Sequence, residues 1–140
     1  MIIYADLHIH SKYSGATSEK MSVKELSAYA PIKGINLLGT GDVIHPLWLK
    51  ELKESLEEVP GTSLYKIKNS QANLYFVAQT EIGTIHEVEG KKRRIHHVVL
   101  MPSFEVAEQV IDVFSKLCDL EADGRPVLAM NPAELIEMLL

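Results

Sequence analysis

Short β-rich apolar runs alternate with amphipathic segments along the sequence, and this alternation restricts the fold more than any other feature. The runs at residues 2–9 and 34–42 have the length and composition of buried strands. Between them, Ser22 and Glu25 have capping-box spacing, which predicts a helix that ends or kinks at Pro31. This β-α-β-α beginning predicts an α/β fold with a largely parallel sheet.

The rest of the chain continues the same pattern. The expected elements are a helix opened by Pro46 and stopped by Pro60-Gly61, three or four strands over 63–102, a helix over 103–117 and a final helix over 133–140. Some of the strands are expected to pair as hairpins through the polar segments 69–73 and 89–93. Asn131 is the expected cap of the final helix.

Length and composition limit the classes of protein to consider. The 140 residues suffice for one core, so residues 1–140 are expected to form a single domain. The chain has no apolar run of about 18–20 residues and no signal-peptide pattern at its start, so a cytoplasmic protein without membrane contact is expected. The single Cys118 excludes a disulfide framework. A net charge of −5 gives no general attraction for DNA, so a DNA partner would need local basic patches or metal ions.

Two histidines separated by one residue in the first apolar run give the strongest chemical signal. On a strand, His8 and His10 would project to the same side as Asp6, where both imidazoles could reach one metal ion. Asp42 and Glu81 each follow an apolar run, at the strand edge where α/β barrels collect their functional groups. Taken singly, Asp42 could be a turn former and Glu81 a solvated strand end. Together these positions predict a metal centre.

The remaining histidines divide into candidates and surface residues. His96 and His97 are adjacent, so on a strand they point to opposite faces and only one of them can join a given centre. His97 is the favoured one. His45 lies close to the proposed centre in the sequence, and its role is left open. His86 alternates with acidic residues and is expected on the surface.

These motifs resemble the PHP (polymerase and histidinol phosphatase) family of metal-dependent phosphoesterases. The resemblance lies in "DLHIHSKYS", "GTGD", the glutamate of "QTEI" and a histidine of "HHVVL", in the family's order. Within the family, the wording of these motifs and of "GRPVLAMNPAELIEML" is most similar to the N-terminal part of endonuclease Q. The resemblance implies the N-terminal portion of a distorted (β/α)7 barrel, with Glu81 bridging two ions. The metal ligands that it implies are His8, His10, Asp42, Glu81 and His97.

The resemblance also implies a cofactor and a longer protein. The intact domain is expected to hold two or three ions, and a histidine-rich set of donors suits Zn²⁺ or Mn²⁺ better than Mg²⁺, which remains an option. Val43 stands where many family members place a histidine. The family's later ligand motifs have no match after His97, so the chain is expected to be the opening part of a longer protein and to bind metal incompletely alone.

Three functions from different classes follow. The first is an endonuclease acting on DNA that contains deaminated bases, in DNA repair. Its phosphate contacts are expected from the cations Lys12, Lys91, Lys92, Arg93 and Arg94. The run at 91–94 can also be interpreted as an exposed hairpin turn. The second function is a phosphatase for a small phosphate monoester, and the third is an inactive half-domain that self-associates through uncovered sheet edges into a homo-oligomer.

Overall fold

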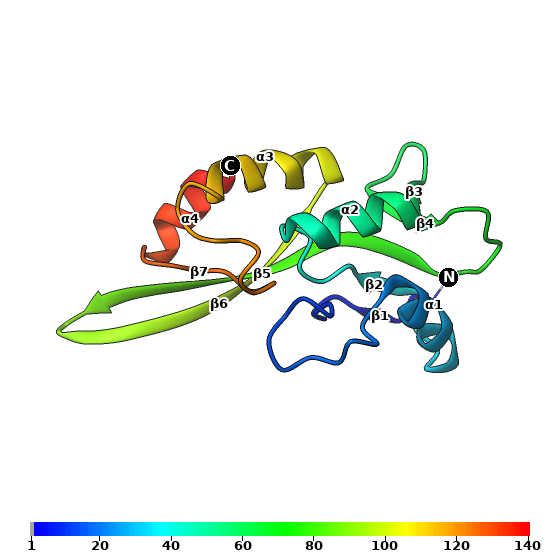
Figure 1. The fold of residues 1–140 in the computed structure, drawn as a ribbon, viewed down its shortest axis with the longest axis horizontal. Coiled ribbons are helices and arrows are strands. Elements are labelled where there is room, and N and C mark those ends of the chain that lie inside the picture. Colours follow the sequence, from blue (N-terminus) through cyan, green and yellow to red (C-terminus); the bar gives the residue numbers. More distant parts are fainter. Residues whose placement is uncertain (1) are drawn as a thin grey trace.

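One long strand, β5, runs along most of the molecule, and the other elements are arranged around it (Figure 1). The computed structural model describes residues 2–140. In chain order, the elements are β1 (Ala5–Asp6), α1 (Val23–Ile32), β2 (Leu37–Gly39), α2 (Pro46–Ser55), β3 (Leu56–Glu58), β4 (Leu64–Ile67), β5 (Tyr75–Val88), β6 (Lys91–Met101), α3 (Phe104–Phe114), β7 (Val127–Leu128) and α4 (Pro132–Leu139). The fold is mixed α/β, and it begins with the predicted β-α-β-α order.

In the described residues, three strand pairs are parallel and three are antiparallel, and most of the paired residues belong to the antiparallel pairs. β1 with β2, β2 with β5, and β5 with β7 are parallel. β3 with β4, β4 with β5, and β5 with β6 are antiparallel. The prediction of a largely parallel sheet is therefore wrong, because strands 56–101 follow one another through short connections, which permit only antiparallel pairing. The sheet of residues 2–140 is open, in the order β1-β2-β5-β4-β3, with β6 and β7 also on β5.

β5 changes neighbours along its length. Residues 75–77 pair with β2, and two of them also pair with β4. Residues 78–88 pair with β6, and residues 83–84 also pair with β7. The middle of β5 therefore lies between the end of its pairing with β2 and the start of its pairing with β7.

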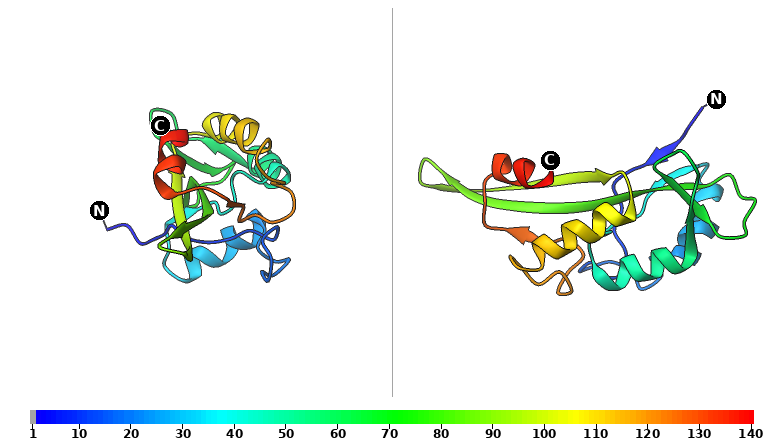
Figure 2. Two further views of the ribbon diagram at one scale, coloured as in Figure 1. Left: turned by 90° about the vertical axis from the view of Figure 1, so that its left-hand side faces the viewer. Right: turned by 90° about the horizontal axis from the view of Figure 1, so that it is seen from above.

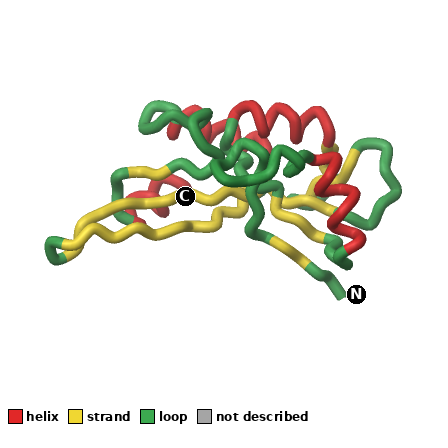
Figure 3. Tube along the Cα trace, turned by 60° about the horizontal axis from the view of Figure 1, so that its bottom comes forward, coloured by secondary structure: helices red, strands yellow, loops and turns green. Residues whose placement is uncertain are grey.

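The helices cover the sheet, whereas the end of one hairpin extends away from it. α2 and α3 lie next to each other along one side of the sheet, and α1 lies beside β1 and β2 (Figures 1 and 2). The far half of the β5–β6 hairpin projects beyond the other elements (Figures 1 and 3, and the right-hand view of Figure 2). Its two-residue turn, Glu89–Gly90, has φ of 52° and 72°, which matches the right-handed twist of a hairpin.

The helices begin at the residues that favour capping. Ser22 and Ser103 accept backbone N–H bonds in the first turns of α1 and α3, and Asn131 forms a capping box with Glu134 in α4. The predicted third helix is confirmed over most of its length, and its buried stripe contains Phe104, Ala107, Val110 and Phe114. Among the described residues, none of the helices combines the length and the apolarity that a bilayer crossing demands.

Three element boundaries differ from the prediction. β1 covers only Ala5–Asp6 of the expected strand 2–9, because its pairing with β2 ends there, so His8 and His10 follow the strand. α2 ends at Ser55 rather than near Pro60, because residues 56–58 pair with β4. α1 continues one residue beyond Pro31, which is tolerated because that proline lies in the last turn of the helix.

The indole of Trp48 fastens α2 to the loop that follows β2. Its side chain is completely buried, and Nε1 donates hydrogen bonds to the carbonyl oxygens of Thr40 at 3.1 Å and of Gly41 at 2.8 Å. These two carbonyls have no helix or strand partner of their own, so the indole N–H satisfies groups that would otherwise be buried unpaired. Trp48 therefore stabilises both the core and the conformation of this turn.

We expect Trp48→Phe to lower the free energy of unfolding by about 1–3 kcal/mol, because the carbonyls of the turn lose their buried donor. The measurement is urea unfolding followed by far-ultraviolet circular dichroism. The control is Leu47→Ala at the neighbouring residue, which is 47% exposed and should change stability by no more than about 0.5 kcal/mol. Equal effects of the two substitutions would contradict this role of the indole.

Candidate metal centre

The segment after β1 and the turn after β2 lie in close contact. Gly41 has φ of 66°, and a Cβ there would lie 2.8 Å from the carbonyl oxygen of Ile9 and 3.1 Å from Cα of His10. Only glycine permits both this backbone conformation and this approach. The turn is held on β5 by a hydrogen bond from the N–H of Val43 to the carbonyl of Gln79, at 3.0 Å. The first histidine motif is thereby brought next to the middle of β5.

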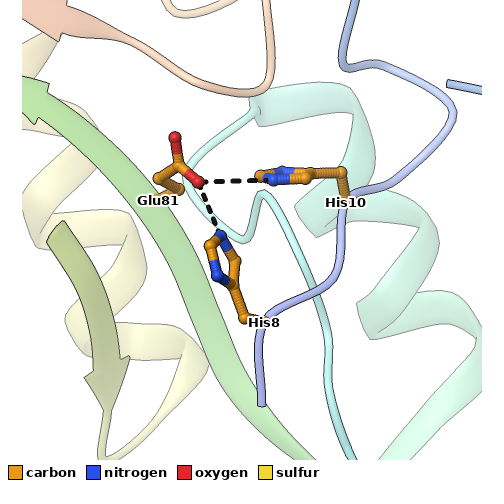
Figure 4. A group of neighbouring side chains, drawn as sticks. All are labelled: His8, His10 and Glu81. Atoms are coloured by element: carbon orange, nitrogen blue, oxygen red, sulfur yellow. Dashed lines mark hydrogen bonds and ion pairs between the residues drawn. The ribbon is translucent and has the colours of Figure 1, made fainter. Parts of the chain in front are cut away.

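His8, His10 and Glu81 converge where these segments meet (Figure 4). One ligand atom from each lies within 4.8 Å of the others, which is close enough to hold a metal ion. Nε2 of His8 lies 2.6 Å from Oε2 of Glu81, and Nε2 of His10 lies 3.4 Å from the same oxygen. The Glu81 side chain is 6% exposed and that of His8 is 50% exposed. The cluster therefore has a buried carboxylate at its base and an open side toward solvent.

Asp42 lies behind His10 and outside this set of three. Its Oδ1 lies 3.0 Å from Nδ1 of His10. Its Oδ2 accepts hydrogen bonds from the N–H and the hydroxyl of Ser11, both at 2.6 Å, and from the hydroxyl of Ser14 at 2.9 Å. The residue is fully buried, with φ of 44°. The structure thus places Asp42 in contact with an imidazole, whereas the sequence predicted it among the ligands.

The adjacent histidines of β6 lie on opposite faces, as expected, but the one that faces Glu81 is His96 and not the predicted His97. Nδ1 of His96 contacts Oε1 of Glu81. Nε2 of His97 instead lies 3.0 Å from the hydroxyl of Thr84 on the other face of the hairpin. The antiparallel register places His96 opposite Gly83, on the same face as Glu81, and a register of this kind is decided by strand pairing. The choice of His97 for the centre therefore disagrees with the structure, which brings His96 there.

The imidazoles around Glu81 determine its protonation. Burial acts to raise the pKa of Glu81, but hydrogen bonding to His96 and His8 and the charge of His10 outweigh it, so its pKa lies below the ordinary value. The carboxylate is therefore ionised at neutral pH. Two or three imidazoles and an ionised carboxylate form a set of donors that fits Zn²⁺ or Mn²⁺.

A loop near the end of the chain covers the first motif, and the sequence pattern alone did not identify it. Gly124 donates its N–H to the carbonyl of Tyr13, and a Cβ at Gly124 would lie only 2.5 Å from Cγ of Asp42. Asp123 accepts from the N–H of Gly15 at 3.3 Å, and Nη2 of Arg125 donates to the Gly15 carbonyl at 2.8 Å. A short polar segment such as "ADGR" has the composition of an ordinary turn, so no local signal marks this contact.

His45, whose role the sequence left open, and Lys12, a predicted phosphate contact, make contacts outside the cluster of His8, His10 and Glu81. His45 is 2% exposed and stacks on Tyr13 with the ring centroids 4.4 Å apart. Lys12, a predicted phosphate contact, forms an ion pair of 2.9 Å with Glu51, and the hydroxyl of Tyr13 donates to the same carboxylate at 2.5 Å. These contacts tie the histidine segment to α2.

The predicted basic run lies inside β6 and not before it. The side chains of Lys91, Lys92, Arg93 and Arg94 are all exposed on the projecting half of the β5–β6 hairpin. The turn itself contains only Glu89 and Gly90. Consecutive cations therefore alternate between the two faces of the hairpin, and Arg94 is two residues from His96, on the same face.

Known proteins resemble this chain in sequence and in fold. No family model matches the chain. An uncharacterized protein of Methanocaldococcus jannaschii is 35% identical over 140 residues, which is 99% of this chain and 15% of the relative.

Two solved structures match both the sequence and the fold. The first is endonuclease Q in complex with a 27-mer duplex substrate that has an abasic lesion at the active site; it is 31% identical, with a TM-score of 0.83. The chain is similar to endonuclease Q. The second is the lesion-specific endonuclease PfuEndoQ from Pyrococcus furiosus, at 28% identity and a TM-score of 0.82. Each match covers 99% of this chain and 32% of the solved chain, so this chain spans about a third of their length.

The contact between Tyr13 and Glu51 predicts a shifted titration. The hydrogen bond to Glu51, then burial and the carboxylate charge, raise the pKa of Tyr13 from 10.0 to about 12. Because the folded pKa is raised, the stability from this pair is complete below pH 10.0 and is lost as the pH rises through about 12. The difference in ultraviolet absorbance between the wild-type chain and Tyr13→Phe should therefore titrate near that pH.

Glu51→Ala should return the pKa of Tyr13 toward its ordinary value, because the acceptor and its charge are both removed. Glu54→Ala, on the same helix, removes an equal charge without touching the phenol and is the matched control. A Tyr13 pKa that stays at about 12 in Glu51→Ala would show that the pair does not exist.

Proposed function

We propose that residues 1–140 form the metal-holding part of a metal-dependent endonuclease that acts on damaged DNA. The observation that carries this proposal is the convergence of His8, His10 and Glu81 in a chain that resembles endonuclease Q in sequence and fold. That enzyme is described in complex with a duplex that has an abasic lesion at its active site. The finer assignments, a PHP-type domain and DNA with deaminated bases as substrate, rest on the motifs of the sequence.

The proposed ligands are His8, His10, Glu81 and His96. They offer neutral nitrogen donors and an ionised carboxylate, for which Zn²⁺ and Mn²⁺ are better suited than Mg²⁺. The two oxygens of Glu81 face different imidazoles: Oε2 faces His8 and His10, and Oε1 faces His96. This division supports a role for Glu81 as a carboxylate shared between two ions.

Asp42 has the role of a positioning residue in this proposal. Its Oδ1 is placed to accept the Nδ1–H of His10, which selects the tautomer whose Nε2 lone pair is free for a metal. Its Oδ2 holds Ser11 and Ser14, so the same carboxylate also fixes the backbone after the motif. Asp42 therefore acts through the imidazole and not as a ligand itself.

Bound cations would supply the chemistry of phosphodiester hydrolysis, by activating water and stabilising the attacking and leaving oxygens. The contribution of this chain is to position the residues that would hold these cations. Glu81 extends from the middle of the longest strand, and the segment of His8 and His10 is clamped by the turn after β2 and by the loop at residues 121–126. Because the imidazoles must be neutral to bind, metal affinity should fall in acid.

The adjacent histidines of β6 provide a matched test of the ligand set. We expect His96→Ala to weaken Zn²⁺ or Mn²⁺ binding by at least roughly tenfold, since even outer partners of a metal site act on that scale. His97→Ala should leave the affinity unchanged, because its imidazole contacts Thr84 on the opposite face. Isothermal titration calorimetry measures both, with circular dichroism to verify folding. A larger loss in His97→Ala would reject the ligand set proposed above.

The proposed reaction is tested on the protein that contains this chain in full. A duplex with one abasic site or one deaminated base should be cut when Mn²⁺ or Zn²⁺ is present, and chelation should abolish cutting. Glu81→Gln removes the charge of the central carboxylate at nearly constant volume, and it should abolish cutting as well. The readout is the length of the labelled DNA strand on a denaturing gel.

Undamaged duplex and a small phosphomonoester are the comparison substrates. Preferential hydrolysis of the monoester would replace the endonuclease with the phosphatase alternative. Equal cutting of damaged and undamaged duplex would retain a nuclease but reject recognition of the lesion.

A further inference from the structure

A small cavity opens directly beside the proposed metal ligands. Its volume is 180 Å³, and it lies between the β5–β6 hairpin and the loop that leads into β7. Its lining residues are Glu81, Gly83, Arg94, His96, Asp123, Arg125 and Val127. Glu81 and His96 line this cavity and are also proposed metal ligands. A group bound in the cavity would therefore be adjacent to any ion held by those ligands.

Two arginines line the cavity together with the carboxylates of Glu81 and Asp123. Arg94 is exposed on β6, and within residues 2–140 it makes no ion pair. Arg125 is held by Nη2 to the carbonyl of Gly15, at 2.8 Å, and its Nε lies 3.5 Å from Asp123. These contacts orient one guanidinium, while the second is available to a ligand. The two arginines come from elements about thirty residues apart, so only the fold brings them together.

The size of the cavity restricts its ligand. Pockets that enclose drug-sized molecules have volumes of roughly 300–1,000 Å³, and 180 Å³ is below that range. A phosphate group is smaller than such molecules, so the space suits a phosphate group. The lack of a side chain at Gly83 keeps this space open, because a Cβ there would lie 3.1 Å from Cγ2 of Val127.

We propose that Arg94 and Arg125 bind one phosphodiester group of the nucleic-acid strand beside the metal centre. The planar guanidinium offers paired N–H donors that match two phosphate oxygens, so two arginines facing one cavity can hold the group in a defined orientation. This assignment rests on the proposed function. It gives Arg94 a role that the other cations of the hairpin do not share, because Arg94 alone among them lines the cavity. Arg93 has the same charge but faces away, because consecutive strand residues point to opposite sides.

The test compares Arg94→Gln with Arg93→Gln in the 140-residue chain. The probe is a fluorescent duplex with a single abasic site, and anisotropy gives its Kd over a range of KCl concentrations, in EDTA and again with Mn²⁺. Arg94→Gln should raise Kd by roughly tenfold and reduce the slope of log K against log salt by about 1. Arg93→Gln should raise Kd less and leave the slope nearly unchanged.

A double-mutant cycle tests whether the two arginines share one phosphate. If they do, Arg94→Gln combined with Arg125→Gln should lose less affinity than the sum of the single losses. Arg125→Lys keeps the charge without the paired donors, and it should recover only part of the binding. Circular dichroism checks that the variants of Arg125, which lose the contact with Gly15, are folded.

Three results would overturn the proposal. They are equal effects of Arg94→Gln and Arg93→Gln, strictly additive losses in the cycle, or failure of the wild-type chain to bind the duplex in either condition. The Kd measured in EDTA does not depend on cleavage. Failure of the endonuclease proposal can therefore be distinguished from failure of the phosphate-binding proposal. In that case the contrast between Arg94 and Arg93 persists although no DNA is cut.

Discussion

The buried carboxylate of Glu81 is the interaction on which the site depends. A carboxylate that is 6% exposed requires partners, because an isolated buried charge would be strongly unfavourable. The partners are imidazoles from two other parts of the chain: His8 and His10 after β1, and His96 on β6. A metal ion would satisfy the same group, so the arrangement that stabilises this carboxylate without metal also prepares it as a ligand. The fold brings these partners together by making β5 long enough to pair with four strands.

Local signals predicted the helices well and the strand limits less well. The caps at Ser22 and Asn131 act within four residues of themselves, so the sequence contains all that they need. The end of α2 at Ser55 was missed because it depends on pairing of residues 56–58 with β4, and a helical pattern that continues to Val59 does not reveal that competition. The proportion of antiparallel pairing was missed for the same reason, since strand partners are chosen by the whole sheet.

At the site, residue types were predictable and their roles were not. The spacing of His8 and His10 and the position of Glu81 after an apolar run are enough to indicate metal chemistry, and the three side chains do converge. Whether Asp42 binds an ion or orients an imidazole depends on which of its oxygens has other donors, and those donors come from Ser11 and Ser14. The cavity of Arg94 and Arg125 had no signal in the sequence, because it forms only where the last loop meets the hairpin.

The sequence by itself determined the alternation of elements, the caps of the helices, the turn of the β5–β6 hairpin and the presence of His8, His10 and Glu81, residue types that can bind metal. These features depend on neighbours a few residues away, where propensity and hydrogen bonding act directly. Tertiary structure alone decided that His96 and not His97 faces Glu81, and that Asp42 supports His10. Both outcomes depend on strand register and on contacts between distant segments, and a shift of one residue in register would reverse the face of every side chain on β6.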